Sequence, residues 1–168
     1  MSSFPPPPAY QEQPTQPAGE PPIWAPWYGI SFGGALRRFF KKYADFSGRA
    51  SRSEYWWVAL AYGILSVVLN IISSVSGGYG SVMATQSGSV SSTSPSAGAV
   101  VVGIISIIIG LAIIVPGLAV TWRRLHDANL AGPFFFLIFI PIVGWIIVLI
   151  MTILGSNPAG QRFDRPRA

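Results

Sequence analysis

Three long apolar segments follow one another along the chain, at about residues 55–75, 99–122 and 134–154. Each has roughly the 20 apolar residues that an α-helix needs to cross a bilayer. None of them contains Asp, Glu, Lys or Arg. The pattern predicts an all-α membrane protein with three transmembrane helices.

The third apolar segment is interrupted by Pro141 and Gly144. Proline removes a helical hydrogen bond, and glycine weakens a helix interior. We therefore keep a second interpretation open, in which residues 134–154 enter the membrane and return to the same side instead of crossing it.

Residues 32–47 show aromatic and aliphatic side chains at helical spacing, with Arg37, Arg38 and Lys41 pointing the other way. This pattern predicts a basic amphipathic helix lying in the headgroup region, where anionic lipid suits its polar face. Packing against other protein is the alternative. A capping box, Ser51 with Glu54, then predicts the start of the first span.

Polar and small residues mark one face of each of the first two spans. Tyr62, Ser66 and Asn70 share a face of the first, and Gly103 and Gly110 share a face of the second. Small residues let membrane helices approach closely, and polar residues prefer other helices to lipid. We expect the two spans to pack through these faces.

The remaining chain divides by composition. Residues 1–30 are proline-rich and polar, which predicts a disordered tail. Residues 31–155 form the membrane domain, including a charge-free Gly/Ser/Thr-rich loop at 77–98, and residues 156–168 form a polar, basic tail.

Composition supports a membrane protein. Only 10% of the 168 residues are charged and 51% are hydrophobic, whereas soluble domains carry roughly 25% charged residues. The net charge of +5 comes from clusters beside the apolar segments, which argues against a nucleic-acid partner. The chain has no cysteine, so disulfides and thiolate metal sites are excluded.

The distribution of Lys and Arg predicts an orientation. Six precede the first span, none lies in the first loop, two lie in the second loop, and three lie in the C-terminal tail. The positive-inside rule places the N-terminus and the second loop in the cytoplasm. Three full spans leave the basic tail outside, whereas a re-entrant third segment brings it inside.

Charged side chains before the first span and after the second meet at one membrane surface in this topology. The candidate site comprises Asp45, Arg49, Arg52, Glu54, Arg123, Arg124, His126 and Asp127. We expect Glu54 or Asp127 to pair with an arginine of the other group, because unpaired charges near hydrocarbon are costly. An ion-pair clamp is the favoured interpretation; binding of an anionic lipid headgroup or a small anionic ligand is the alternative.

Catalysis and transport are less favoured. One histidine without cysteine does not supply an ordinary zinc site, and no nucleophile elbow or phosphate-binding loop is present. We expect no cofactor and no metal.

The spans lack ionisable residues, so a small transporter or channel would have to oligomerise. By elimination, the sequence favours a non-enzymatic scaffold or accessory subunit, partnered by itself or by another membrane protein.

Two motifs resemble a known family. The run from Phe39 to Trp57, and Arg123–Asp127 followed by Pro141–Gly144, resemble a bacterial family of small inner-membrane proteins, the domain of unknown function 805. The resemblance covers about residues 32–165 and implies membrane residence, without an established activity. The family's closing Asn-Arg-Phe-Gly-like element is replaced here at both ends, at Gln161–Asp164.

Overall fold

The computed structural model describes residues 19–76 and 96–164. The regular secondary structure of these residues is all helical, with no strand. In chain order, its elements are α1 (Phe32–Lys41), α2 (Arg52–Val75), α4 (Ala97–Asp127), the 3-10 helix η1 (Gly132–Phe139), α5 (Val143–Ile153) and the 3-10 helix η2 (Pro158–Phe163). The expectations for residues 1–18, for most of the 77–98 loop and for residues 165–168 lie outside the described residues.

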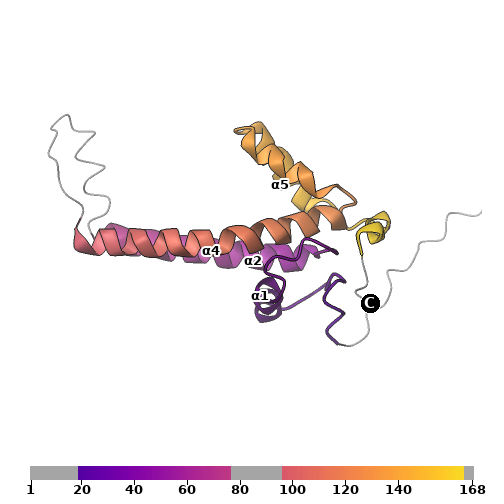
Figure 1. Ribbon diagram of the computed structural model, residues 1–168, viewed down its shortest axis with the longest axis horizontal. Helices are drawn as coiled ribbons and strands as arrows, with labels where there is room; N and C mark the ends of the chain where they lie inside the picture. The colour runs from indigo at the N-terminus through magenta and orange to yellow at the C-terminus, as the bar shows by residue number, and fades with distance from the viewer. Residues whose placement is uncertain (1–18, 77–95, 165–168) are drawn as a thin grey trace, which may run out of the picture.

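Helices α2 and α4 run side by side as a long antiparallel pair (Figure 1). Both are long and apolar enough to cross a membrane. The predicted capping box starts α2, since Ser51 Oγ accepts from the Glu54 backbone and the Glu54 carboxylate accepts from the Ser51 backbone. Buried or half-buried positions recur along α4 every three or four residues: Ala99, Val102, Ser106, Ile109, Ile113, Pro116 and Val120.

Helix α4 continues five residues beyond the predicted span, so Arg123 to Asp127 are helical rather than part of a loop. It also continues through Pro116. Proline has no N–H to bond the carbonyl four residues earlier, which is that of Ala112. The Tyr43 hydroxyl donates to this oxygen at 2.6 Å. The long helix therefore keeps its hydrogen bonding despite the proline.

Helix α1 appears almost end-on in Figure 1, so its axis runs across those of α2 and α4. Ser31 caps its start, and it ends at Lys41 rather than at residue 47 as predicted. The assignment of Arg38 to the exposed polar face is also wrong, because Arg38 is buried against α2. Phe39 packs in the small core with Ala50, Val58 and Val120.

The third apolar segment is not one continuous helix. It consists of η1 and α5, joined by a turn in which Ile142 has a φ of 64°. Gly144 makes the turn feasible, because a Cβ there would lie 1.8 Å from the Leu137 carbonyl oxygen. Gly132, at one end of the segment, lies against the Trp122 ring, and the Leu154 carbonyl, at the other end, accepts from Arg124. Both ends therefore meet at the same end of α4 (Figure 1).

The predicted close approach of the spans at their glycines is wrong, although Ala99 and Ser106 of the predicted small face are half-buried. A Cβ added to Gly63, Gly103 or Gly110 would meet no neighbouring atom within 4 Å. On α2, Tyr62 is 52% exposed, and Ser66 donates to the backbone of its own helix. The half-buried positions also include aliphatic side chains, Leu65 and Leu69 on α2 and Val102 and Ile109 on α4.

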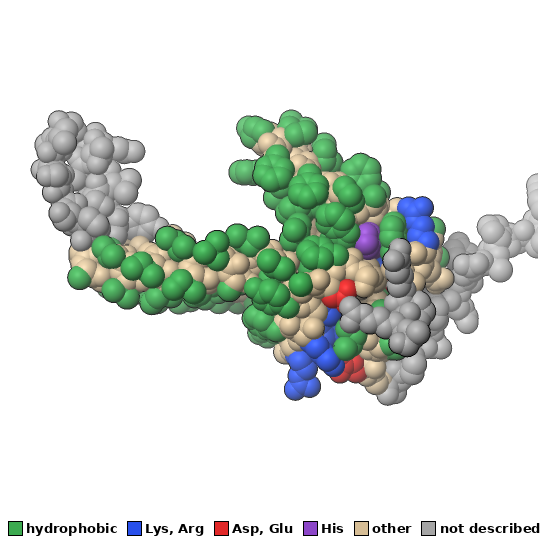
Figure 2. Space-filling model, viewed as in Figure 1, with side chains coloured by type: hydrophobic (Ala, Val, Ile, Leu, Met, Phe, Trp, Pro, Cys, Tyr) green, Lys and Arg blue, Asp and Glu red, His purple; other side chains and the backbone are tan. Residues whose placement is uncertain are grey.

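Segments flanking the membrane domain cover its charged end. Residues 19–30 were expected to be disordered, yet Ile30 is buried and the Pro21 and Pro22 carbonyls accept hydrogen bonds from Arg38. Residues 156–164 lie against the end of α4, where the backbone N–H of Asn157 donates to the Asp127 carbonyl at 2.8 Å. Figure 2 shows apolar side chains over the paired helices and α5. The charged side chains gather at the end of the helix pair near α1 and η2.

Candidate functional site

The predicted charged residues separate into two clusters. We call the first the Asp127 cluster; its charged members are Arg49, Arg124, Asp127 and Asp164. We call the second the Glu54 cluster; its charged members are Glu20, Arg38, Lys42, Asp45, Glu54 and Arg123. Arg52 and His126 lie beside the Asp127 cluster and bond to backbone carbonyls.

Asp127 joins four parts of the chain. Its carboxylate is 0% exposed, and Oδ1 accepts from the Tyr28 hydroxyl at 3.0 Å. Arg49 Nη1 lies 3.7 Å from Oδ1. Oδ2 accepts from Arg124 Nη1 at 2.7 Å and from Ser156 Oγ. Three hydrogen-bond donors and the ion-pair partner Arg49 leave the buried carboxylate well compensated.

Arg49 makes its shortest ion pair with Asp164. Its Nε lies 3.0 Å from both carboxylate oxygens and its Nη2 lies 2.6 Å from Oδ2. Asp164, like Gln161, is one of the two end positions at which the closing element differs from the pattern it resembles. Its long-range pairing with Arg49 carries no signal in the sequence.

The arginines on this side also fix the end of α5. Arg124 Nε donates to the Thr152 carbonyl at 2.9 Å, and both Arg124 and Arg52 donate to the Leu154 carbonyl. Carbonyls at a helix C-terminus lack intrahelical donors, so these guanidinium groups satisfy them. The C-terminal end of α5 is therefore held at the level of the Asp127 cluster.

His126 does not bond to its neighbour Asp127. Its Nδ1 lies 3.1 Å from the Gly48 carbonyl oxygen, and its ring stacks on Phe163 at a centroid distance of 4.0 Å. Gly160 passes so close that an added Cβ would lie 2.4 Å from the His126 carbonyl oxygen. His126 thus helps to pack residues 158–163 against α4.

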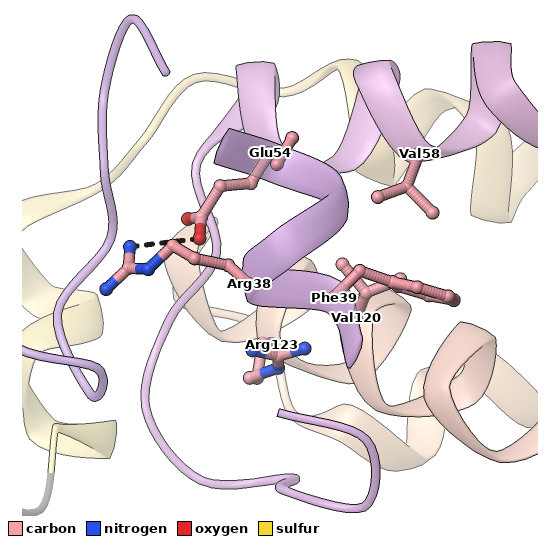
Figure 3. Close-up of a pocket in the computed structure, with 7 residues that line it drawn as sticks. Arg38, Phe39, Glu54, Val58, Val120 and Arg123 are labelled. Atoms are coloured by element: carbon pink, nitrogen blue, oxygen red, sulfur yellow. Dashed lines mark hydrogen bonds and ion pairs between the residues drawn. The ribbon is translucent and has the colours of Figure 1, made fainter. Parts of the chain in front are cut away.

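In the Glu54 cluster, the central pair is Glu54 and Arg38, at 3.1 Å between Oε1 and Nη1 (Figure 3). Glu54 Oε2 accepts from the backbone N–H groups of Ser51 and Trp27, at 3.0 and 3.2 Å. Arg38 also lies over the Trp27 ring at 5.5 Å. Sequence reasoning missed Arg38 because its spacing placed it with the exposed basic residues.

Two further cations are buried beside this pair. Arg123 and Lys42 are each only 2% exposed. Arg123 Nε donates to the Ala119 carbonyl at 3.1 Å, whereas no atom among residues 19–76 and 96–164 accepts a hydrogen bond from the Lys42 ammonium. Burial lowers the pKa of Lys42 to about 7; Glu54 and Asp45 oppose this shift, and Arg123 and Arg38 add to it.

The sequence predicted that the charged residues before the first span would contact those after the second. Asp127 and Arg49 meet as expected, whereas Glu54 pairs with Arg38 of α1. The Asp45 side chain accepts from the Ser47 backbone at 3.1 Å. Sequence reasoning also missed Tyr28, Lys42 and Asp164, whose contacts depend on tertiary structure.

The chemistry available at these clusters is that of ion pairs and anion binding. In the described part of the chain, no group of three or more His, Asp or Glu side chains could hold a metal ion. The Glu54 cluster borders a small cavity of about 10 Å³, lined by Arg38, Glu54, Arg123 and apolar side chains (Figure 3).

The chain has recognisable relatives. Residues 43–165 match the family described as protein of unknown function (DUF805). Inner membrane protein YhaI of Escherichia coli (strain K12) is 28% identical over 123 residues, which are 73% of this chain and 86% of that protein. Inner membrane protein YhaH of the same strain is 30% identical over 126 residues, 75% of this chain and 89% of that protein. No solved structure matches. The chain therefore belongs to the DUF805 family of proteins of unknown function.

Proposed function

We propose that this protein is a non-enzymatic component of a bacterial inner membrane, acting as a scaffold or accessory subunit. One observation carries the proposal: most of the charged residues that could have formed a reaction site are buried and bonded to other groups of the same chain. Asp127, Arg124 and Glu54 each have at least two partners within the chain. Groups bonded in this way hold segments together and do not present themselves to a substrate.

The membrane domain in this proposal has two spans and a re-entrant hairpin rather than three spans. Support comes from η1 and α5, since both ends of their segment lie at the charged end of α4. Its exposed side chains are apolar, including Phe139, Trp145 and Ile150 (Figure 2). At 11 residues, α5 is about 16 Å long, roughly half the hydrocarbon thickness.

The charged end faces the cytoplasm in this proposal. The hairpin places residues 156–164 beside Arg49 and Asp127, so the basic tail follows the positive-inside rule together with the N-terminal cations. Helix α1 lies across the spans and exposes Arg37 and Lys41 along with Phe40. This combination suits an interfacial helix that contacts anionic lipid headgroups.

Single cysteines test the topology, because the natural chain has none. In intact cells, an impermeant thiol reagent should label Ser89→Cys, between the two spans. It should label Gln161→Cys only after the inner membrane is opened. Labelling of Gln161→Cys in intact cells would show that the third segment crosses the membrane.

Site-specific photo-crosslinking tests the scaffold role. A photoreactive residue at Trp145, exposed on α5, should give a discrete adduct with a membrane protein or with a second copy of this chain. The same residue at Phe39, which is buried in the core, should give no intermolecular adduct. If the Trp145 position reacts only with lipid, the scaffold proposal loses its support.

A further inference from the structure

The outer side of α2, opposite the half-buried Leu65 and Leu69, is not uniformly apolar. Its exposed positions include Gly63, Asn70 and Ser74. On α4, in contrast, every exposed side chain between residues 104 and 115 is apolar, as expected of a helix surface that contacts only lipid. Polar side chains within a membrane favour a protein neighbour over lipid. The outer side of α2 therefore carries a signal for a protein partner that this part of α4 lacks.

The outer positions of α2 follow a seven-residue repeat. Steps of four and three residues alternate along it, which places the side chains in one line on the helix surface. We call this line the α2 seam; it consists of Trp56, Leu60, Gly63, Val67, Asn70 and Ser74. Two helices that pack side by side use this spacing at their contact.

A groove runs along the seam from residue 56 to residue 68. It has a volume of about 520 Å³, and its lining residues all belong to α2: Trp56, Ala59, Leu60, Gly63, Ile64, Val67 and Val68. A Cβ added to Gly63 would meet no atom within 4 Å, so the groove is open at this glycine. Glycine in a membrane helix allows the backbone of a second helix to approach closely.

Asn70 indicates which helix fits the groove. It lies 14 residues after Trp56, about 21 Å along α2 and within a hydrocarbon core of roughly 30 Å. Its side chain is exposed, and its Nδ2 donates to the Ser66 carbonyl of the same helix at 2.7 Å. A carboxamide contains both donors and an acceptor, so it is complementary to a second carboxamide at the same depth.

A second copy of this chain provides that carboxamide. Copies of one chain share one orientation in the membrane. A two-fold axis along the membrane normal therefore brings Asn70 of one copy to the depth of Asn70 of the other. Lipid chains can fill the groove, but they leave the carboxamide facing hydrocarbon.

We propose that the protein forms a parallel homodimer through the α2 seam. The α2 helices of the two copies meet closely at Gly63, and the two Asn70 carboxamides are hydrogen-bonded across the two-fold axis. The proposal rests on the membrane location of α2. It does not depend on the hairpin at residues 134–154 or on a partner at Trp145 of α5, so either can fail without the other.

Cysteine crosslinking in native membranes tests the contact, because the natural chain has no cysteine. After oxidation, Val67→Cys, on the seam, should give a product of twice the chain mass. Ile72→Cys is the control, since Ile72 is also exposed but lies about 140° around the helix axis from Val67. No product from Val67→Cys, a product of another mass, or equal yields from the two positions would overturn the proposal.

The contribution of Asn70 is measured by Förster transfer between full-length copies labelled at Gln161→Cys, which lies outside the seam. The copies are reconstituted in phospholipid vesicles and diluted stepwise with lipid. Asn70→Leu should raise the dissociation constant of the dimer by roughly 5–30-fold, as expected for the loss of a hydrogen bond between membrane helices. Asn70→Gln keeps a carboxamide and should raise it less.

Two glycine variants complete the test in the same vesicles. Gly63→Leu fills the groove and should weaken the dimer at least as much as Asn70→Leu does. Gly103 on α4 is equally open, since an added Cβ would also meet no atom within 4 Å. Gly103→Leu should therefore leave the dissociation constant unchanged. Förster transfer that is the same in the wild type, Asn70→Leu and Gly63→Leu would overturn the proposal.

Discussion

The two charge clusters lie at the same end of the molecule but achieve stability in different ways. The Asp127 cluster collects residues from distant parts of the chain, including Tyr28, Arg49 and Asp164, and matches each positive charge with a negative one. The Glu54 cluster draws mainly on residues 38–54, with Glu20 and Arg123 as its distant members, and contains a buried ammonium, that of Lys42, without a hydrogen-bond acceptor in the described chain. The comparison separates a cluster that joins distant segments from a cluster in which one buried group, the Lys42 ammonium, lacks a hydrogen-bond acceptor among the described residues.

The largest effect should come from removing the central acid of the balanced cluster. Asp127→Asn keeps the shape of the side chain but leaves Arg49 and Arg124 without their shared carboxylate. We expect the free energy of unfolding to fall by about 3–5 kcal/mol, as for other broken buried ion pairs. Urea or thermal unfolding in detergent measures it. Asp45→Asn is the control, and an equal loss in both variants would show that Asp127 has no special role.

An effect of opposite sign is expected in the Glu54 cluster. Lys42→Met removes a buried ammonium, so at about pH 6 the variant should be more stable than the wild type by about 2–4 kcal/mol. The unfolded chain holds this proton up to its ordinary pKa of about 10.5. The wild type therefore gains stability as the pH rises from about 7 to 10.5, and the advantage of the variant shrinks. A pH-independent difference would contradict this account.

The smallest effect concerns the edge of the balanced cluster. Asp164→Asn removes the bidentate partner of Arg49, but Asp127 remains 3.7 Å away to compensate the guanidinium. A loss of about 1–2 kcal/mol is expected. A double-mutant cycle with Arg49→Gln should show coupling of similar size. Coupling near zero would mean that residues 158–164 are held by the Phe163–His126 stacking alone.

Sequence reasoning found the elements whose signals are local. The bounds of α2 and its capping box follow from Ser51, Glu54 and a charge-free apolar run. It failed where two local patterns compete. The apolar run of residues 134–154 outweighed Pro141 and Gly144 in the favoured prediction, whereas the structure turns the chain at those residues.

The charged site was predicted in composition but not in pairing. Every candidate residue except Asp45 and Arg52 proved to be buried, in keeping with the cost of isolated charge near hydrocarbon. Partner choice depends on which segments fold back over the helix ends. Residues 19–30, 38–42 and 156–164 do so here, and their polar side chains resemble ordinary surface residues in the sequence.

The bond from Tyr43 to the Ala112 carbonyl has a consequence for membrane thickness. Ala112 precedes Arg123 by 11 residues, which places that carbonyl about 16 Å along α4 from the charged end. The 31 residues of α4 extend about 46 Å, well beyond the roughly 30 Å of a hydrocarbon core. The Tyr43 hydrogen bond holds residues 42–46 against α4. Protein therefore covers part of the length by which α4 exceeds the hydrocarbon core. We thus expect a bilayer to contact less than the full length of α4, so that less hydrophobic mismatch has to be relieved by tilting the helix.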